Sequence, residues 1–291
     1  GWRTTLSAKL ERKDGRFAYT DNQGRTFDLP ELEEDEGQVL FEAEQIIFER
    51  IDNGSYQISS LDGDSRQRFS PLHLNGTNRI GSGDGDYVLT RVSDRHGNGY
   101  RIVYNEDTSL PHTVIDELGR KIWFEFDNLS PLTQIPVYRL TSMGSYNDNL
   151  PEGREVLVRY RYDDNGDLVA VEDTEGFVHR RFGYRRHMMI RHQTAAGLNT
   201  YYQYDHYTPK GRVLRSHTDN GEEWRFAYAD GHTQITDALG RSEHLYYDHH
   251  GEVIKKVFAD GSSVLTERDA LGRPIKSIDA MGRETRYRYN E

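Results

Sequence analysis

The chain has 291 residues, a formal net charge of −11 and no cysteine. It therefore has no disulfide and no cysteine-ligated zinc site, and its acidic balance with dispersed basic residues argues against a nucleic-acid partner. It also lacks a run of the roughly 20 apolar residues that a membrane-spanning helix needs. Hydrophobic residues make up only 35%, yet 19 tyrosines, 11 phenylalanines and regular turn signals favour a folded, thin sheet without a thick core.

Residues 1–92 predict β-hairpins of irregular length. The dipeptides at 14–15 (Asp-Gly) and 53–54 (Asn-Gly) lie between alternating runs, and such dipeptides are the strongest short-range hairpin signal. We interpret the acidic run at 31–36 as a solvated loop rather than a cation site. Residues 41–50 suit a short helix by composition, but the turn that follows favours a strand in their second half.

The C-terminal third contains a repeat with a fixed period. Its turn glycines are separated by 11, 10, 11 and 10 residues, so every second step is 21. The phrase Asp-Ala-(Leu/Met)-Gly-Arg occurs three times. The turn residues that it predicts are Asp237, Gly240, Arg241, Asp269, Gly272, Arg273, Asp279, Gly282 and Arg283.

The chemistry of this phrase predicts a tight turn. The aspartate side chain can accept a hydrogen bond from the backbone two residues on, and the glycine supplies the positive φ. The runs between turns alternate in polarity and are too short to include a crossover helix. Successive strands are therefore expected to be antiparallel, so the repeated unit is a β-hairpin.

Several steps end in an aromatic-polar-aromatic-acid tetrad. Aromatic residues at i and i+2 point to the same face of a strand, where they would form a ladder of rings that helps to set register. The predicted ladder consists of Tyr160, Tyr162, Tyr202, Tyr204, Tyr287 and Tyr289, and Phe124 and Phe126 follow the same pattern. Residues 128–155 break the period with prolines and Asn/Asp pairs, which predicts an inserted loop.

Motifs for catalysis and metal binding are missing. We find no nucleophile elbow, zinc-protease helix or phosphate-binding loop. The glycine- and aspartate-rich segment 81–86 lacks the order of a calcium loop and is interpreted as a flexible linker. His249 and His250 would face opposite sides of a strand and could not chelate one ion together. His232 and His244 are a conceivable cross-strand metal pair, but the interpretation as surface or wall histidines without a metal is favoured. We expect no catalysis, no cofactor and no metal.

The phrases Y-x-Y-D, D-x-x-G-R and D-A-L-G-R at a 21-residue period resemble the Rhs/YD repeats of bacterial Rhs proteins, which also occur in insecticidal toxin complexes and teneurins. The resemblance is clearest over 94–291, and it divides the chain into a preceding region, 1–92, and repeats, 93–291. It implies an all-β fold of repetitive antiparallel hairpins in a spiralling, curled sheet, as a segment of a hollow β-shell.

By this resemblance the chain would enclose and carry a C-terminal toxin domain of the same longer polypeptide for interbacterial competition. Delivery would be by type VI secretion, from the cytoplasm of the producing cell to the outside. A secretion spike protein and a chaperone are further candidate partners, and targeting information would lie outside this chain. The alternative function is a cell-surface carbohydrate- or receptor-binding module of YD repeats.

Overall fold

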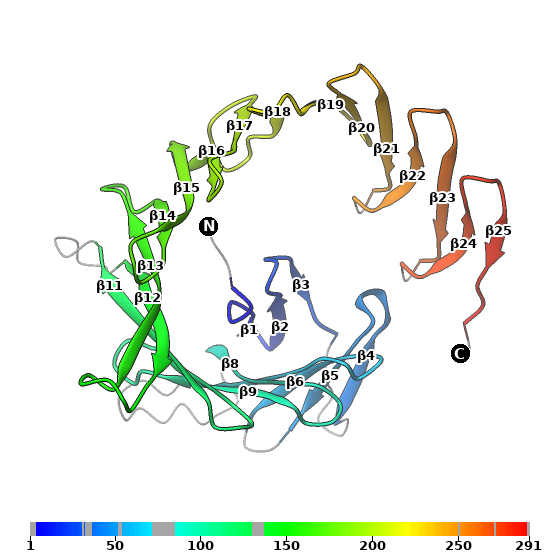
Figure 1. Cartoon of the computed structure of the whole chain (residues 1–291). Helices are drawn as coiled ribbons and strands as arrows, with labels where there is room; N and C mark the ends of the chain where they lie inside the picture. The colour runs from blue at the N-terminus through cyan, green and yellow to red at the C-terminus, as the bar shows by residue number, and fades with distance from the viewer. Residues whose placement is uncertain are drawn as a thin grey trace. The chain divides into compact units, whose positions relative to one another are not determined.

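The computed structural model describes residues 4–30, 32, 37–51, 54–71, 85–129, 137–249, 251–270 and 272–289. The predicted acidic loop at 31–36 and linker at 81–86 lie largely outside these residues. The described part forms 25 β-strands and one short 3-10 helix, η1 (Glu42–Glu44) (Figure 1). The strand pairings described within it are antiparallel, for example those that join the first three strands and the last two, so the predicted all-β class of antiparallel hairpins is confirmed.

The chain folds as two compact units, Gly1–Leu157 and Val158–Glu291. The sequence-based division between residues 92 and 93 follows repeat character instead, and it stays a prediction. Strand β13 (Arg154–Tyr162) crosses the boundary between the units.

The first unit contains the following strands: β1 (Lys9–Lys13), β2 (Arg16–Thr20), β3 (Thr26–Asp28), β4 (Gln38–Phe41), β5 (Ile46–Arg50), β6 (Tyr56–Ser60), β7 (Arg66–Pro71), β8 (Gly85–Ser93), β9 (Gly99–Tyr104), β10 (Pro111–Asp116), β11 (Lys121–Asn128) and β12 (Tyr138–Tyr146). For residues 41–50 the sequence suits a short helix and favours a strand in the second half. The structure has both, since the short helix η1 is followed by strand β5. The segment 128–155, where a loop is predicted, includes β12 in its described part.

An aromatic core holds the first unit together. Strand β1 pairs with β2 and also with β8, far along the chain, which returns the N-terminal hairpin to the sheet. From β2, the ring of Phe17 contacts Phe48 on β5 (5.2 Å between centroids) and Tyr56 on β6 (4.6 Å). Since β2 pairs with β1 and β3, these contacts come from packing of one face on another. The unit is therefore thicker than the composition predicts, and Leu10, Phe48, Phe69 and Leu89 are fully buried.

The second unit is a thinner succession of hairpins. Its strands are β14 (Leu168–Glu172), β15 (Val178–Arg185), β16 (Met188–Thr194), β17 (Asn199–Tyr204), β18 (Val213–Thr218), β19 (Glu223–Ala229), β20 (His232–Asp237), β21 (Ser242–Tyr247), β22 (Val253–Val257), β23 (Ser263–Arg268), β24 (Pro274–Ile278) and β25 (Glu284–Arg286). Among its described residues only Leu168, Ala170 and Thr233 are buried. Most side chains of this unit thus keep some contact with solvent.

One turn geometry recurs between the strands, and the turn at Asp279 illustrates it. The Gly282 amide donates to the Asp279 carbonyl (2.9 Å), and Gly282 has φ +77°. One carboxylate oxygen of Asp279 accepts from the backbone amides of Met281 and Arg283, both at 2.9 Å. The aspartate thus satisfies two turn amides, while glycine adopts the left-handed conformation that other residues rarely take.

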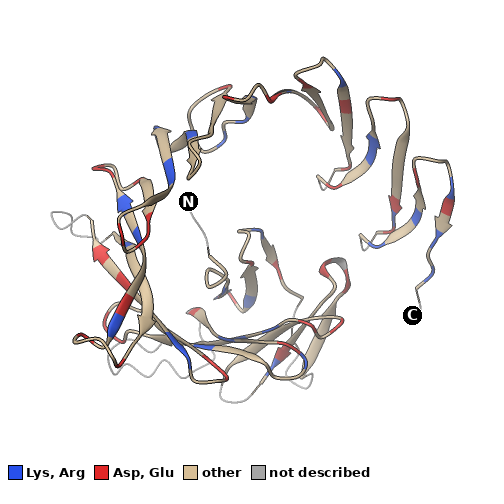
Figure 2. Cartoon of the chain, in the orientation of Figure 1, with Lys and Arg blue, Asp and Glu red and all other residues tan. Residues whose placement is uncertain are grey.

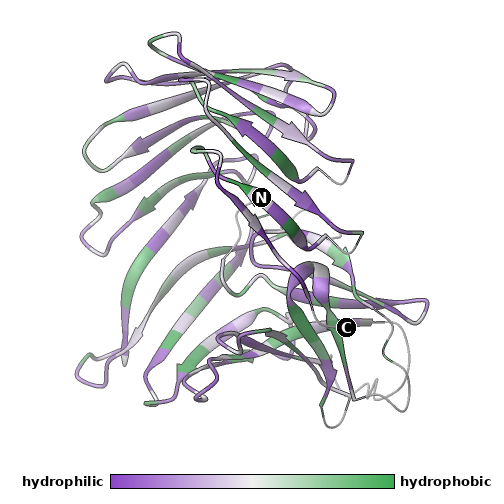
Figure 3. Ribbon diagram, turned by 90° about the vertical axis from the view of Figure 1, so that its right-hand side faces the viewer, coloured by the Kyte–Doolittle hydropathy of each residue, from purple (hydrophilic) through white to green (hydrophobic). Residues whose placement is uncertain are grey.

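At turns in both units an aspartate carboxylate accepts a hydrogen bond from the backbone amide four residues on, and Figure 2 shows acidic residues at many of these connections. The turns with this geometry begin at Asp21, Asp94, Asp116, Asp163, Asp173, Asp237, Asp248, Asp269 and Asp279. Each fixes where one strand ends and the next begins. The alternation of hydrophobic and hydrophilic residues along the strands follows from this register (Figure 3).

A second recurring feature joins bulges to tyrosines. In β8, β16, β18 and β24 the pairing register shifts by one residue, which is the signature of a β-bulge. The carbonyl just before each bulged residue accepts a hydrogen bond from a tyrosine hydroxyl 15 positions later. The pairs are Leu89–Tyr104 (2.8 Å), Met189–Tyr204 (2.9 Å), Val213–Tyr228 (2.7 Å) and Pro274–Tyr289 (2.7 Å). A bulge interrupts the regular ladder, so the hydroxyl supplies a donor where the ladder is irregular.

The turn aspartates predict acid-sensitive stability. The backbone amide of Arg283, followed by its guanidinium, lowers the pKa of Asp279, and the side chain of Asn98 does the same for Asp94. A lowered pKa in the folded state stabilises the fold fully above the unfolded-state pKa of about 3.9. That contribution is lost as the pH falls through the lower folded-state value. The melting temperature should therefore fall as the pH is lowered from 5 to 3, which is about the pH range over which these groups titrate.

Thermal unfolding followed by circular dichroism at stepped pH measures this effect. Asp279→Asn serves as the control, because the amide oxygen can still accept the backbone hydrogen bonds but does not titrate, and its melting temperature should vary less with pH. A melting temperature that stays constant from pH 6 to pH 3 would contradict the prediction.

The bulge contacts predict a cost for removing a single hydroxyl. Tyr228→Phe keeps the ring but removes the hydrogen bond to Val213, and it should lower the free energy of unfolding by about 1 kcal/mol in urea titrations. Tyr202→Phe is the matched control, because no described hydrogen bond involves the Tyr202 hydroxyl. Equal losses in the two variants would show that the bulge contact contributes nothing specific.

Candidate functional site

The three repeat phrases predicted from the sequence place their arginines in two different environments. Arg241 and Arg283 each form an ion pair with the aspartate of their own turn, at 2.7 and 2.6 Å, and their side chains are 65% and 76% exposed. Arg273 forms the same ion pair, with Asp269 at 2.8 Å, but its side chain is only 20% exposed. The same repeat phrase therefore has different surroundings at different turns.

The difference follows from alternation of the turns between the two ends of the strands. The turn at Asp269 lies at the opposite end from those at Asp237 and Asp279, because an odd number of strands separates them. There the Arg273 guanidinium lies 4.6 Å from the centre of the Tyr289 ring, a cation–π contact. The Tyr289 hydroxyl also donates to the Pro274 carbonyl. Asp269, Arg273 and Tyr289 are thus connected in series, and we call this arrangement the Asp–Arg–Tyr clamp.

A second, looser clamp occurs in the same unit. Arg212 lies 4.5 Å from the ring centre of Tyr228, whose hydroxyl donates to Val213, and its contact with Asp205 is longer, at 3.9 Å. Sequence reasoning missed this function of the arginines and tyrosines. The sequence signal that could have predicted it is a tyrosine 16 positions after the turn arginine, as Tyr228 follows Arg212 and Tyr289 follows Arg273.

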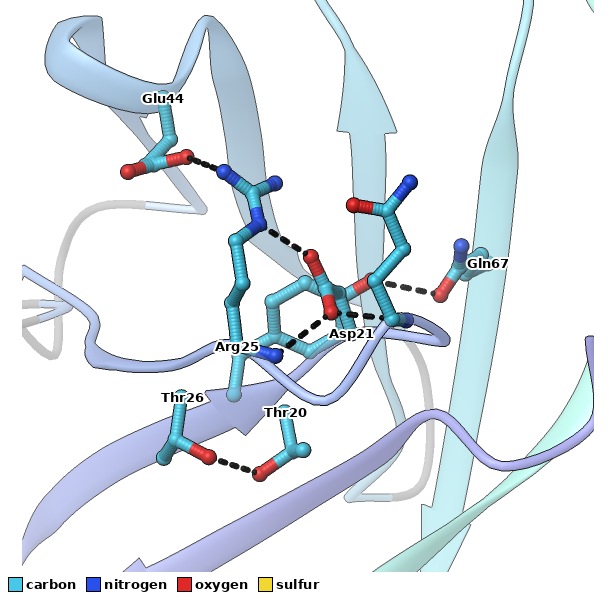
Figure 4. Close-up of polar contacts among 8 residues, drawn as sticks. Thr20, Asp21, Arg25, Thr26, Glu44 and Gln67 are labelled. Carbon is cyan, nitrogen blue, oxygen red and sulfur yellow. Dashed lines mark hydrogen bonds and ion pairs between the residues drawn. The ribbon is translucent and has the colours of Figure 1, made fainter. Parts of the chain in front are cut away.

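In the first unit, the turn at Asp21–Arg25 contacts the short helix η1 through its arginine. Arg25 binds Asp21 at 2.8 Å and also contacts Glu44 of η1 at 3.5 Å (Figure 4). Beside it the Tyr19 hydroxyl donates to Gln67 at 2.9 Å. Burial, followed by the charge of Asp21, raises the pKa of Tyr19 to about 12, so this hydroxyl stays protonated as a donor.

The predicted aromatic ladder is distributed over separate hairpins. Tyr160 and Tyr162 lie on β13, Tyr202 and Tyr204 on β17, and Tyr287 and Tyr289 just after β25. Strands β13 and β17 are four places apart in the succession of pairs, or about 19 Å at the usual strand spacing. The tyrosines thus act within their own hairpins rather than as one continuous stack.

The two faces of strand β19 differ in chemistry. Trp224, Phe226 and Tyr228 point to one face, and Trp224 is 45% exposed. The opposite face holds Glu223, which binds Arg215 on β18 and Arg225 on its own strand, both at 2.5 Å. The Arg215 hydrogen bond, more than any other contact, lowers the pKa of Glu223 and keeps it ionised. On this strand, one face thus offers aromatic surface and the other paired charges.

Potential metal ligands and a pocket are the features of the described residues that bear on catalysis. These residues contain no cluster of three or more potential metal ligands, although His232 and His244 are in contact. A shallow pocket in the first unit includes Glu125 and Arg154, but Glu125 accepts a hydrogen bond from Ser142 (2.6 Å) and Arg154 lies over the Trp123 ring. No helix in the described part of the chain is long and apolar enough to cross a membrane.

Comparison with known proteins gives relatives among bacterial toxins, whereas no protein-family model matches. The chain is 32% identical over 276 residues to toxin protein Tse5 of Pseudomonas aeruginosa, which covers 91% of this chain and 19% of that protein. It is 29% identical over 252 residues to double-stranded DNA deaminase toxin A of Burkholderia cenocepacia, covering 85% of this chain and 16% of that protein. The chain thus spans less than a fifth of the length of either relative.

Two further similarities are more limited. Over 132 residues, 44% of this chain, it is 33% identical to the probable deoxyribonuclease RhsA of Dickeya dadantii, of which it covers 9%. The crystal structure of TcdB2–TccC3 without its hypervariable C-terminal region aligns at a TM-score of 0.31 and 11% identity, over 95% of this chain and 20% of that one. With the repeated turns and the sequence similarity to Tse5 and the other toxins, the chain belongs to the Rhs/YD-repeat family of bacterial polymorphic toxin proteins.

Proposed function

We propose that this chain forms part of the wall of a shell that encloses the toxin domain of a longer polypeptide, and that the segment itself has no catalytic activity. The observation that carries the proposal is the succession of hairpins in the second unit, each joined to the next by ladder hydrogen bonds. Similarity to Tse5 and deaminase toxin A, both named as toxins and both far longer than this chain, supports the same function.

The construction of the second unit suits a container wall. A strand is added by pairing with the strand before it, as β22, β23, β24 and β25 are, so the sheet can be extended without rearranging earlier parts. The clamp links consecutive hairpins at one end of the strands. At β19, faces of different chemistry let one side contact an enclosed chain while the other contacts water.

The proposal extends to delivery. The toxin would leave the producing bacterium with its shell, by type VI secretion, and would act in competition between bacteria. A secretion spike protein and a chaperone would assist export. The activity against the target cell would belong to the enclosed domain, in keeping with relatives that are named as a deaminase toxin and a deoxyribonuclease.

Mass spectrometry and limited proteolysis of the native gene product test the proposal. We expect a chain much longer than 291 residues, with a C-terminal toxin fragment that co-purifies and resists protease until the shell is denatured. A toxin domain that is digested as fast in the native protein as in isolation would overturn the enclosing function.

The aromatic face predicts which side contacts the enclosed chain. In the full-length protein, Trp224→Ser should speed digestion of the toxin fragment several-fold, because it removes exposed apolar surface that an unfolded chain can bury. Gln203→Ser, an exposed change on the opposite face of β17, is the matched control. Faster digestion in the control and no change in the Trp224 variant would reverse the assignment of the faces.

A further inference from the structure

Two histidines on neighbouring strands of the second unit lie in direct contact. The Nε2 atom of His232, on β20, is 3.0 Å from the Nδ1 atom of His244, on β21. Their ring planes are within 7° of parallel, with centroids 5.2 Å apart. Gln234 is the direct partner of His244 across the strands, so the histidines form a diagonal pair on one face.

The separation of the two nitrogens matches the requirement of a shared metal ion. Zinc–nitrogen bonds are about 2.0–2.1 Å long, so two such bonds place their nitrogens about 2.9 Å apart at a right angle and about 3.4 Å apart at the tetrahedral angle. The observed 3.0 Å lies within this interval. In the hydrogen-bonded pair the two nitrogens face each other, so both rings would turn away from the line between them to direct their lone pairs at one ion.

The backbone fixes the pair before any metal arrives. The two strands are held by five consecutive register pairs, from His232–Tyr246 to Thr236–Ser242. The ring of Tyr246 lies against His232 with centroids 4.7 Å apart, which restricts the imidazole. Both histidines are half-buried, so an ion could keep water molecules as its remaining ligands.

We propose that His232 and His244 form a two-histidine site for a divalent transition metal ion, zinc or copper, with water completing its coordination. Imidazole nitrogen suits both ions, and copper(II) should bind more tightly than zinc. A ring N–H lies between the two nitrogens when they are hydrogen-bonded to each other, so binding of the metal requires that this proton move to the other nitrogen of the same imidazole, which leaves both facing nitrogens free to coordinate as neutral ligands. The ion would cross-link β20 and β21 in a chain that has no cysteine for a disulfide.

Isothermal titration calorimetry of the chain with zinc chloride and with copper(II) chloride tests the site. The wild type should bind one equivalent of either ion, and metal should raise its melting temperature. His244→Gln and His232→Gln keep a side chain that can form hydrogen bonds but lose the metal ligand, and each should weaken binding at least tenfold. His96→Ala, which removes an exposed histidine from a turn of the first unit, should bind as the wild type does.

Electron paramagnetic resonance of the copper-loaded wild type gives an answer that does not depend on how the variants fold. Superhyperfine structure from two imidazole nitrogens is expected. The proposal is overturned by the absence of saturable binding, by equal affinity in the wild type and the His244 variant, or by a copper spectrum without two imidazole nitrogens.

Discussion

The side chain of the turn aspartate is the constraint on which the rest of the sheet depends. A sheet built from short strands has to reverse direction every few residues, and each reversal leaves backbone amides that the ladder cannot pair. The carboxylate satisfies two of them at once, as Asp279 does, and the following glycine allows the backbone to close. Because side chains alternate with a period of two, a turn displaced by one residue would exchange the aromatic and charged faces of the next strand. Turn chemistry therefore decides which residues share a face.

The two ends of the strands in the second unit are chemically different. One end includes the turn at Asp269, and strand β24, which follows this turn, has a bulge. There the Tyr289 hydroxyl donates to the Pro274 carbonyl, and the Tyr289 ring covers Arg273. At the other end, Arg241 and Arg283 are exposed after the same phrase. Bulges increase local twist, so an end that collects them bends the strands more than the other. An arginine in this phrase thus has its function set by the end at which it lies.

Sequence alone predicts the class, the direction of pairing and the turns of this fold, because aspartate and glycine at a fixed spacing have few conformations open to them. It does not predict the core of the first unit, since nothing local in Leu10 or Phe17 indicates that their strands return to β8 and lie against β5 and β6. The tyrosine-to-carbonyl contacts were also missed, because they depend on bulges whose position follows from strand pairing. For the histidines, only the register between β20 and β21 shows that His232 and His244 share a face and brings their nitrogens together.

The pairing of β1 with β8 has a consequence for the order of folding. Hairpins of the second unit need only neighbouring sequence, so each can form within microseconds once both of its strands exist, as isolated hairpins do. The N-terminal strand, in contrast, has to wait for residues near Val88 before it finds its second partner, and closing so long a loop costs entropy that local turns do not. During synthesis on the ribosome, β1 would therefore complete its pairing only after β8 has been made, although its hairpin with β2 can form earlier.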